Sequence, residues 1–299
     1  MYKFTFVVLH YKTLQDTIEC VDSILYSVKY ENYYIVLVDN GSNDNSGVIL
    51  KKRYENNSNV VVLINEINLG FAKGNNIGFN YAKYLLKSDF IALLNNDTYI
   101  KQPEFISLII AKYDKFKFDV IGPDVISPID NSHQNPRRLT LKNKNRLKKL
   151  ILHHQLLLVL NYFLIDLLME KIKKFFLPKA FLSNDNPQYL NHFQEQVNVK
   201  LSGCCLIFSP NFISSYDGLF EKTFLYSEEE ILYYICKRDD KKTFYFPDAK
   251  IFHKEDSTVN YLYKSSLIKR RFYYKNFIKS GKVFVELIND DNKLENWDD

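Results

Sequence analysis

Short apolar runs alternate with helically spaced segments through the first 125 residues, and this alternation constrains the fold more than any other feature of the chain. The runs with strand character are Phe4–His10, Tyr34–Val38, Val60–Ile64 and Phe90–Leu94. Between them, apolar residues recur at helical spacing over Thr13–Val28, around Ile77–Leu86 and after Pro103. Strands linked by single helices form a parallel sheet with helices on both faces. We therefore expect an α/β fold that binds its ligands at the carboxyl ends of the strands.

A different composition replaces this alternation from about Pro128 to Gln196. Polar and basic residues come first, and the largely apolar Leu150–Leu168 follows, so we interpret residues 128–196 as a helical insertion. The later elements that we expect are a strand within Val197–Phe208, a helix at Glu228–Cys236, strands at Thr243–Phe246 and up to His253, and a basic helix at Tyr261–Leu287. The simplest division is a main domain over residues 1–258 and a basic helical segment with an acidic tail over residues 259–299.

The composition indicates a packed protein with reduced thiols. Apolar residues make up 46% of the 299-residue chain, and only 9 glycines and 8 prolines argue against a repetitive or linker-rich protein. The cysteines form no CxxC pair, and we expect buried, reduced thiols at Cys20, Cys204, Cys205 and Cys236. The apolar run before His10 is too short for a signal peptide. We therefore expect a cytoplasmic location.

The triplet Asn95-Asn96-Asp97 directly follows the apolar strand Phe90–Leu94, so it lies where the expected sheet opens to solvent. A divalent cation that bridges phosphates needs hard oxygen ligands and keeps some water, so one or two carboxylates suffice. The same residues would also suit an ordinary polar turn. Taken alone, the triplet does not decide between a metal site and a turn.

Two further strand ends carry polar residues. The loop Asn68–Gly78 has three glycines and enters a helix, an arrangement that lets backbone amides approach a phosphate. It matches neither the dinucleotide-binding fingerprint nor the P-loop. Asp39 precedes Asn-Gly-Ser, and its carboxylate would either accept hydrogen bonds from a nucleobase or ribose, or close a turn.

Acidic residues open the helix that is expected after the aromatic run FLY. The helix dipole would favour Glu228, Glu229 and Glu230 there even without a function. In the functional interpretation, one of them is a general base for an acceptor hydroxyl, a role that suits a partly desolvated carboxylate. His253 follows the last expected strand and would be a metal ligand, a contact to a diphosphate, or a structural residue.

Seven short segments, taken in order, resemble the family 2 glycosyltransferases: VVLHYKT, VLVDNGSND, NLGFAKGNN, LLNNDT, LSGCCLIF, FLYSEEE and FHKEDST. Within that family they are most similar to the rhamnosyl- and galactosyltransferase-like enzymes of bacterial surface-polysaccharide assembly. The resemblance covers about residues 3–127 and 197–258. Seven matches in one order are far more specific than any single motif.

The resemblance implies a GT-A fold with a mixed, mostly parallel sheet and an inverting, metal-assisted hexosyl transfer. The donor would be a UDP- or dTDP-linked hexose or deoxyhexose, and the acceptor a hydroxyl of a lipid-linked saccharide in capsule or O-antigen synthesis. Donor contacts are implied for His10, Tyr11, Asp39, Asn68, Gly70, Asn75, Asn76, Asn95 and Asn96. Asp97 and His253 would hold Mg²⁺ or Mn²⁺, and Glu229, with Glu228 beside it, would be the base.

The chain departs from the family pattern at three points. Lys12 stands where many relatives carry Asn, and Ile231 stands where an acidic residue often follows the catalytic pair. The DXD-like triplet has one carboxylate instead of two. These departures bear on metal affinity and on the choice between Glu228 and Glu229.

Two basic segments allow other interpretations. Residues 137–174 hold ten Lys or Arg against two acids, and residues 264–282 hold seven and no acid. They would suit an anionic inner membrane leaflet, or a solvated face packed on the domain or on a second subunit of a homodimer. Their Tyr and Phe residues also suit a nucleic-acid-binding protein, but that alternative leaves the strand-end residues unexplained, so no nucleic acid is expected. A nucleotidyltransferase is disfavoured because Val7–Thr13 contains no glycine, and an inactive homologue that binds nucleotide-sugars is a further alternative.

Overall fold

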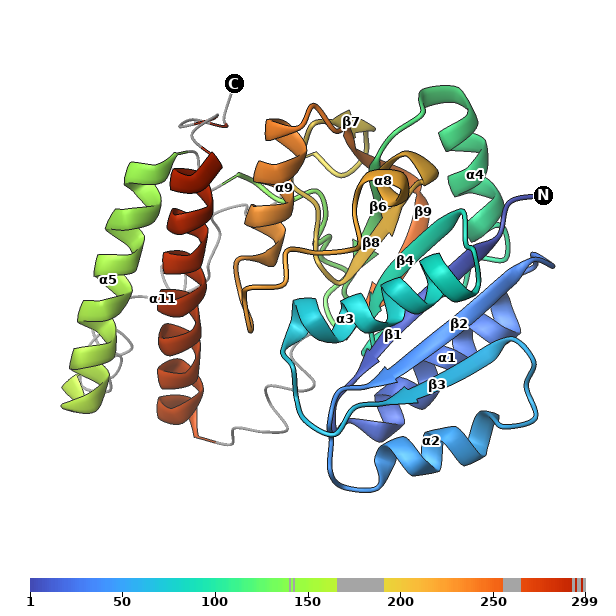
Figure 1. The fold of residues 1–299 in the computed structure, drawn as a ribbon, viewed down its shortest axis with the longest axis horizontal. Coiled ribbons are helices and arrows are strands. Elements are labelled where there is room, and N and C mark those ends of the chain that lie inside the picture. Colours follow the sequence, from blue (N-terminus) through green and yellow to red (C-terminus); the bar gives the residue numbers. More distant parts are fainter. Residues whose placement is uncertain are drawn as a thin grey trace.

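One mixed sheet with helices on both sides forms the core of the protein (Figure 1). The computed structural model describes residues 1–139, 141, 143–165, 191–254, 265–291, 294 and 297. The strands are β1 (Phe4–His10), β2 (Tyr33–Asp39), β3 (Val60–Ile64), β4 (Phe90–Asn95), β5 (Thr98–Tyr99), β6 (Val120–Ile126), β7 (Gln196–Val197), β8 (Cys205–Phe208) and β9 (Thr243–His253). The helices are α1 (Leu14–Ser27), α2 (Ser46–Tyr54), α3 (Phe71–Asn80), the π-helical η1 (Tyr81–Leu85), α4 (Phe105–Phe116), α5 (Lys144–Tyr162), α8 (Pro210–Ser215), α9 (Glu228–Arg238) and α11 (Ser266–Asp291).

The parallel half of the sheet comes from the first hundred residues. β1 lies between β2 and β4 and pairs in parallel with both, and β3 lies parallel on the outer side of β2. β8 is antiparallel to both β4 and β6, and it joins this half to the parallel pair β6–β9. The sheet order is β3-β2-β1-β4-β8-β6-β9-β5, with β7 on β9. The expected α/β fold with a mixed sheet is confirmed.

Alternate residues of the central strands pack on opposite faces of the sheet, as the period of two in a strand requires. On β1, Phe4, Phe6 and Val8 pack with residues of α1, α2 and α4. Val7 faces the other way and packs with residues of α3, α8 and α9. Because helices cover both faces, the strands are apolar along their whole length, which makes them recognisable as short apolar runs.

Three expected elements have different bounds in the structure. The helix expected around Ile77–Leu86 begins at Phe71, directly after Gly70, whose φ of +84° completes the glycine loop. Val197–Phe208 contains two strands, β7 and β8, instead of one. β9 is continuous through its proline, because the pairing with β6 shifts register and residues 247–249 bulge out of the ladder.

Two long helices, α5 and α11, lie side by side next to α9 (Figure 1). A Cβ on Gly281 of α11 would lie 2.9 Å from Ile151 Cγ1, so glycine permits the close approach of the two helices. Phe284 of α11 packs against Tyr234 of α9 and against Trp297. The pair is therefore attached to the helix that begins with the three glutamates. These helices correspond to the expected Leu150–Leu168 and Tyr261–Leu287, of which residues 166–168 and 261–264 lie outside the described residues.

The four cysteines are buried and unpaired. Burial raises the pKa of Cys20 and of Cys204 to about 12, and it raises the pKa of the other two thiols as well. Thiols of this kind hold little thiolate and react slowly. The expectation of buried, reduced thiols is confirmed.

Candidate active site

Antiparallel pairing of β5 with β9 places Thr98 opposite His253. This pairing brings His253 Nε2 to 3.2 Å from Asp97 Oδ1, with both side chains mostly buried. His253 Nδ1 lies 2.7 Å from the side-chain oxygen of Gln134, which can only accept a hydrogen bond, so Nδ1 carries the proton. In the neutral ring, Nε2 then directs a lone pair toward the space beside the carboxylate. A backing partner of this kind is what orients a metal-binding imidazole.

The two asparagines of the triplet have different surroundings. The side-chain amide of Asn96 donates to the hydroxyls of Thr13, at 2.7 Å, and Thr17, at 2.8 Å. Asn96 is buried and therefore fixes the end of β4 against the start of α1. Asn95 is half-buried, so it is the asparagine of the pair that keeps solvent-accessible surface.

Asp39 ends β2 beside the end of β1. Its Oδ1 accepts hydrogen bonds from the backbone N–H of Ser42, at 3.1 Å, and from the Ser42 hydroxyl, at 2.5 Å. A Cβ on Gly47 would lie 2.1 Å from Oδ2, so α2 presses directly on this carboxylate. His10, its register partner, is fully buried, and each ring nitrogen lies 2.7 Å from a hydroxyl of α1 or α2. His10 therefore supports the strand ends from behind and has no exposed surface for the donor contact that the sequence predicted.

Among the other predicted donor residues, some keep groups that a ligand can reach and others use their side chains in internal contacts. Tyr11 is half-buried, with Lys12 Nζ 5.6 Å from its ring centre. Asn76 uses its whole side-chain amide on the backbone of Leu219, donating at 2.7 Å and accepting at 2.8 Å, so it joins α3 to that segment and does not face open space. Asn75 is buried, but its Oδ1 has no hydrogen-bond partner among the described residues. Such an acceptor is available to a ligand or to water.

Asn40 organises the glycine loop that leads into α3. Its side-chain amide donates to Asn68 Oδ1 at 3.1 Å and to the Gly70 carbonyl at 3.0 Å, and its oxygen accepts from Leu69 N–H at 3.1 Å. Asn68 in turn accepts from the backbone N–H of Gly70 at 2.8 Å. A Cβ on Gly70 would lie 2.3 Å from the Phe224 carbonyl, so the loop packs directly on the segment before α9.

The second and third glutamates of α9 form ion pairs. Glu229 accepts from Arg137 Nη1 at 2.6 Å through one oxygen and from the backbone N–H of Gly203 at 2.5 Å through the other. Glu230 pairs with Lys200 at 2.8 Å. The Glu229 side chain remains 19% exposed. It is therefore oriented by two partners while keeping surface that another molecule can reach.

Glu228 is in a different environment. Its Oε1 is shut off from solvent and has no hydrogen-bond partner among the described residues. Burial, with the charges of Glu229 and Glu230 as smaller contributions, raises the pKa of Glu228 to about 7. Near neutral pH this carboxyl is thus close to half protonated.

The dipeptide Gly203-Cys204 connects the two acidic regions. Cys204 accepts a hydrogen bond from the backbone N–H of Asn95 at 3.0 Å, while Gly203 donates to Glu229. Burial is the main reason that the pKa of the Cys204 thiol is raised, and the charges of Glu229 and Asp97 both add to it as smaller contributions. The predicted metal residues and the predicted base therefore border one region.

The donor set suits a cation that is shared with a ligand. The described part of the chain contains no group of three or more His, Cys, Asp or Glu residues arranged for a metal ion. Asp97 and His253 supply one carboxylate and one imidazole, so the other positions would fall to water and phosphate oxygens. Mg²⁺ and Mn²⁺ are commonly held in this manner beside a diphosphate. The residues present fit such an ion.

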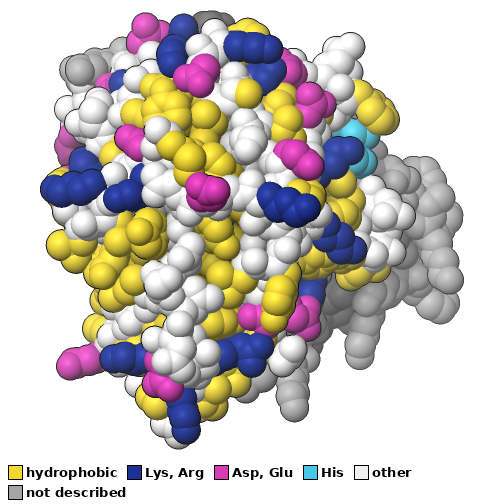
Figure 2. All heavy atoms as spheres, turned by 90° about the vertical axis from the view of Figure 1, so that its right-hand side faces the viewer, with side chains coloured by type: hydrophobic (Ala, Val, Ile, Leu, Met, Phe, Trp, Pro, Cys, Tyr) yellow, Lys and Arg dark blue, Asp and Glu magenta, His cyan; other side chains and the backbone are white. Residues whose placement is uncertain are grey.

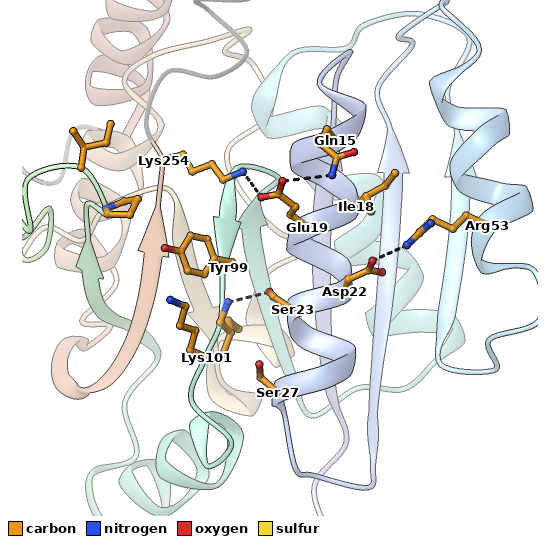
Figure 3. A pocket seen from close by; sticks show the side chains of 13 residues that line it. Gln15, Ile18, Glu19, Asp22, Ser23, Ser27, Arg53, Tyr99, Lys101 and Lys254 are labelled. Atoms are coloured by element: carbon orange, nitrogen blue, oxygen red, sulfur yellow. Dashed lines mark hydrogen bonds and ion pairs between the residues drawn. The ribbon is translucent and has the colours of Figure 1, made fainter.

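A hollow of about 1010 Å³ lies between α1 and the edge formed by β5 and β9 (Figure 3). Its walls carry both charges, since Lys254 pairs with Glu19, and Arg53 pairs with Asp22 at 2.7 Å. Lys254 directly follows His253 in the chain. The hollow therefore borders the metal-site candidate through this lysine, and α1 anchors the end of β9.

The sequence model of the family described as Glycosyl transferase family 2 matches residues 5–165, more than half of the chain. The chain belongs to this family. The resemblance predicted from the seven segments is therefore confirmed, and family membership favours a glycosyltransferase over the nucleic-acid-binding alternative. The match includes β1 to β6 and the candidate residues from Asp39 to Asp97.

Curated relatives of this family 2 chain match a part of it. Glycosyltransferase GlyG of Streptococcus pneumoniae serotype 4 is 34% identical over 116 residues, which are 39% of this chain and 37% of that protein. Poly-beta-1,6-N-acetyl-D-glucosamine synthase of Staphylococcus aureus strain MSSA476 is 36% identical over 87 residues, which are 29% of this chain and 20% of that protein. The chain thus aligns with well under half of the length of either relative.

Two solved structures extend the likeness over most of the fold. S. aureus TarS, residues 1–349, matches with a TM-score of 0.52 at 16% identity, over 84% of this chain and 60% of that chain. The mannosyltransferase PcManGT from Pyrobaculum calidifontis, in complex with GDP-Man and Mn²⁺, matches with a TM-score of 0.54 at 10% identity, over 96% of this chain and 71% of that chain. At these identities the likeness establishes the fold, and it agrees with the GT-A arrangement that the resemblance implied.

Four residues of the site were not singled out from the sequence. They are Asn40, Gln134, Arg137 and Lys200, which contact the glycine loop, His253, Glu229 and Glu230 respectively. Gln134 and Arg137 lie in the polar and basic stretch that was interpreted as the start of a helical insertion. The sequence around a lysine or arginine gives no signal of which distant acid the side chain pairs with in the folded protein. Only Asn40, next to Asp39 in the DNGS turn, offered such a signal.

Proposed function

We propose that this family 2 enzyme transfers a hexose or deoxyhexose from a UDP- or dTDP-linked donor to a hydroxyl of a lipid-linked saccharide, with inversion, in bacterial surface-polysaccharide synthesis at the cytoplasmic side of the membrane. The observation that carries the proposal is the connection of the Asp97–His253 pair to Glu229 through Gly203-Cys204. The synthase among the relatives builds a polysaccharide by its name, and the mannosyltransferase neighbour was solved with a nucleotide-sugar and Mn²⁺.

In this proposal, Asp97 and His253 hold Mg²⁺ or Mn²⁺ against the donor diphosphate. The ion would neutralise charge that develops on the diphosphate as it leaves. Gln134 keeps the His253 ring in the tautomer whose Nε2 can bind a cation. The single carboxylate leaves room for phosphate oxygens around the ion, so we expect metal and donor to bind more tightly together than either alone.

The groups near the strand ends that are still open to a ligand indicate how the donor would be held. Asn40 holds Asn68 and Gly70 in place, and backbone groups of this loop lie at the start of α3, where the helix dipole favours phosphate. Half-buried Tyr11 is placed to cover the base, and Asp39 to position the nucleoside from the end of β2. The Oδ1 of Asn75 is an acceptor still without a partner among the described residues.

Glu229 is the base in this proposal. Its carboxylate takes the proton of the acceptor hydroxyl while that oxygen attacks the anomeric carbon and the bond to the diphosphate oxygen breaks. Gly203 and Arg137 orient the carboxylate, and each oxygen keeps a further lone pair for the acceptor. The pKa of Glu228 is raised, but its Oε1 is shut off from solvent, whereas both oxygens of Glu229 are held by partners in an accessible carboxylate, and geometry precedes pKa in choosing a base.

A donor panel tests the proposal. The chain is incubated with UDP-, dTDP- and GDP-sugars, with and without Mn²⁺, and both the melting temperature and the release of nucleoside diphosphate are measured. We expect one donor to raise the melting temperature and to release its diphosphate only with the metal. E229Q should keep the donor-induced shift and lose about 10²–10⁴-fold in turnover. Donor binding without turnover by the native chain would support the inactive homologue instead, and an active E229Q enzyme would refute the assigned base.

A further inference from the structure

Helix α5 is apolar on two opposite faces, and only one of them is covered. The covered face, which includes Leu147 and Ile151, packs on α11. On the opposite face, Leu152, Leu156 and Val159 are 65%, 56% and 51% exposed. A surface helix ordinarily turns its apolar stripe toward the core and carries charged or polar residues on the face away from it. The exposed face of α5 therefore lacks a partner within the described chain.

The exposed residues lie in one line along the helix. At about 100° per residue, the positions of Leu152, Leu156, Val159 and Phe163 fall within about 60° of one another. Phe163, at the end of the helix, is 72% exposed. We name these four residues the apolar stripe. Single exposed apolar residues are common, but an aligned patch of this kind marks an interaction surface.

The stripe widens at its carboxyl end. Further exposed apolar residues there are Tyr162, Leu164, Ile165 and Ile268. Ile268 belongs to α11 and lies at this end because Asn161 Nδ2 donates to the carbonyl of the residue before it. The Arg271 guanidinium and Lys275 Nζ lie 4.2 Å and 5.5 Å from the Tyr162 ring centre. An aromatic ring flanked by long cations at the rim of an apolar surface is typical of the level of lipid headgroups.

The other end of the stripe is basic. Lys148 and Lys149 are exposed on either side of its line, one turn before Leu152. α5 contains four Lys or Arg residues in all and no acid. The end of the molecule far from α5 is different, because Lys and Arg alternate there with Asp and Glu (Figure 2). Positive charge without compensating acids is thus combined with exposed apolar surface on α5.

We propose that α5 docks on an anionic lipid bilayer, with the apolar stripe in the acyl-chain boundary and Lys148 and Lys149 among the headgroups. No helix in the described ranges is long and apolar enough to cross a membrane, so α5 would lie along the surface. It is the outermost element at its end of the molecule, with α11 between it and the sheet, so docking needs no rearrangement of the domain (Figure 1). This inference goes beyond the proposed function and does not depend on the donor.

Charge distribution favours a bilayer over a second copy of the chain. In a parallel two-fold pairing of α5 helices, Lys148 and Lys149 of both copies would face each other. In an antiparallel pairing, these lysines would oppose the apolar end around Phe163. Neither arrangement covers the stripe without placing charge against charge or charge against apolar surface. A tilted helix on an anionic bilayer satisfies both ends.

Co-sedimentation with vesicles tests the proposal on the full chain without any donor. Native protein should bind vesicles of mixed phosphatidylglycerol and phosphatidylcholine, bind pure phosphatidylcholine much less, and bind less at high salt. L152Q/L156Q/V159Q should lose at least about tenfold in partitioning. K148E/K149E should lose the preference for the anionic vesicles. The matched control is Y26Q/L85Q/F116Q, which makes the same change at exposed residues of α1, η1 and α4.

Melting temperatures equal to that of the control establish that the variants fold. If the stripe variant does not fold, K148E/K149E still tests the proposal, because it changes only exposed charges. Its preference for anionic vesicles should then be lost. Native protein that ignores anionic vesicles at low salt, or a folded stripe variant that binds as the control does, would overturn the proposal. Sedimentation of the native chain as a dimer that the stripe variant converts to monomer would assign the stripe to a second copy. Vesicle binding and donor turnover are separate readouts, so failure of one leaves the other intact.

Discussion

His253 Nε2 and Asp97 Oδ1 lie 3.2 Å apart, with the opposite ring nitrogen of His253 held by Gln134. Asp97 directly precedes β5 and His253 ends β9, so the two residues are adjacent only because these strands pair. A carboxylate and a backed imidazole in this relation can share one cation. Asp97 and His253 are the candidate ligands, and Gln134 orients the imidazole. The two roles predict different effects on the Kd for the cation.

Removing the ligands should weaken Mn²⁺ binding more than removing their support. We expect D97N and H253A to raise the Kd for Mn²⁺ by more than about 100-fold, and Q134L to raise it by about 10- to 100-fold. Electron paramagnetic resonance of free Mn²⁺ measures the Kd without turnover. H153A is the matched control, because His153 is exposed on α5. Equal Mn²⁺ binding by native protein and D97N would remove Asp97 from the metal site.

Glu228, whose Oε1 is shut off from solvent, should make stability depend on pH. Its pKa rises from 4.5 to about 7 on folding, so the folded state retains a proton that the unfolded state releases. The free energy of unfolding therefore falls as the pH rises from about 4.5 to beyond 7, by on the order of 3 kcal/mol in total. E228Q cannot ionise and should gain about 2 kcal/mol over the native chain between pH 5 and pH 8.

Urea unfolding at the two pH values measures this difference. E221Q is the control, because Glu221 is exposed in the segment before the same helix. If the stability difference between E228Q and the native chain is the same at both pH values, Glu228 does not hold a proton in the folded protein.

Asn40 should matter for donor binding and not for the chemical step. Its side chain makes three hydrogen bonds to the loop from Asn68 to Gly70, and alanine would leave those backbone groups without their partner. We expect N40A to raise the KM for the donor about tenfold, with kcat within about threefold of native. N56A, which removes an exposed side-chain amide, provides the comparison. A fall in kcat with an unchanged KM would contradict a loop-ordering role.

Arg137 should act through Glu229. R137A removes the guanidinium that orients one carboxylate oxygen, so we expect kcat to fall about 10- to 100-fold while donor-induced thermal stabilisation is retained. R137K should recover part of the loss. The adjacent Arg138 is exposed and supplies a control of identical chemistry, R138A. In an E229Q background, R137A should cause little further loss, whereas additive losses would mean that Arg137 acts elsewhere.

The local pattern of apolar residues was sufficient to predict the bounds of strands that are covered on both faces. β1 and β3 have the predicted bounds, because strands covered on both faces are apolar from end to end. The start of α3 was not predictable, because three glycines and three asparagines in Asn68–Gly78 suggest a loop, while the contacts of Asn40 and Phe224 make the segment helical from Phe71. The bulge that lets β9 pass its proline depends on the partner strand.

The candidate site was predictable only in part, for a similar reason. Asp97 and Glu229 stand directly after a strand and at a helix start, positions that local sequence reveals. Gln134, the partner of His253, and Arg137, the partner of Glu229, lie in an irregular segment after β6, and only the folded chain shows which imidazole or carboxylate each one meets. His10 illustrates the converse, since a motif position can serve the core: its burial lowers the pKa of the imidazole, and its two hydroxyl partners are fixed by α1 and α2.

The pairing of β5 with β9 also has a consequence during synthesis of the chain. When the parallel strands β1 to β4 and their helices have been synthesised, Asp97 follows soon after, but the imidazole that β9 carries is still to come. The cation site is closed only when one of the last strands to emerge inserts beside β6 and meets β5. A chain that ended before β9 would therefore carry Asp97 without the imidazole that lies 3.2 Å from it in the full fold, and so only half of the candidate cation site.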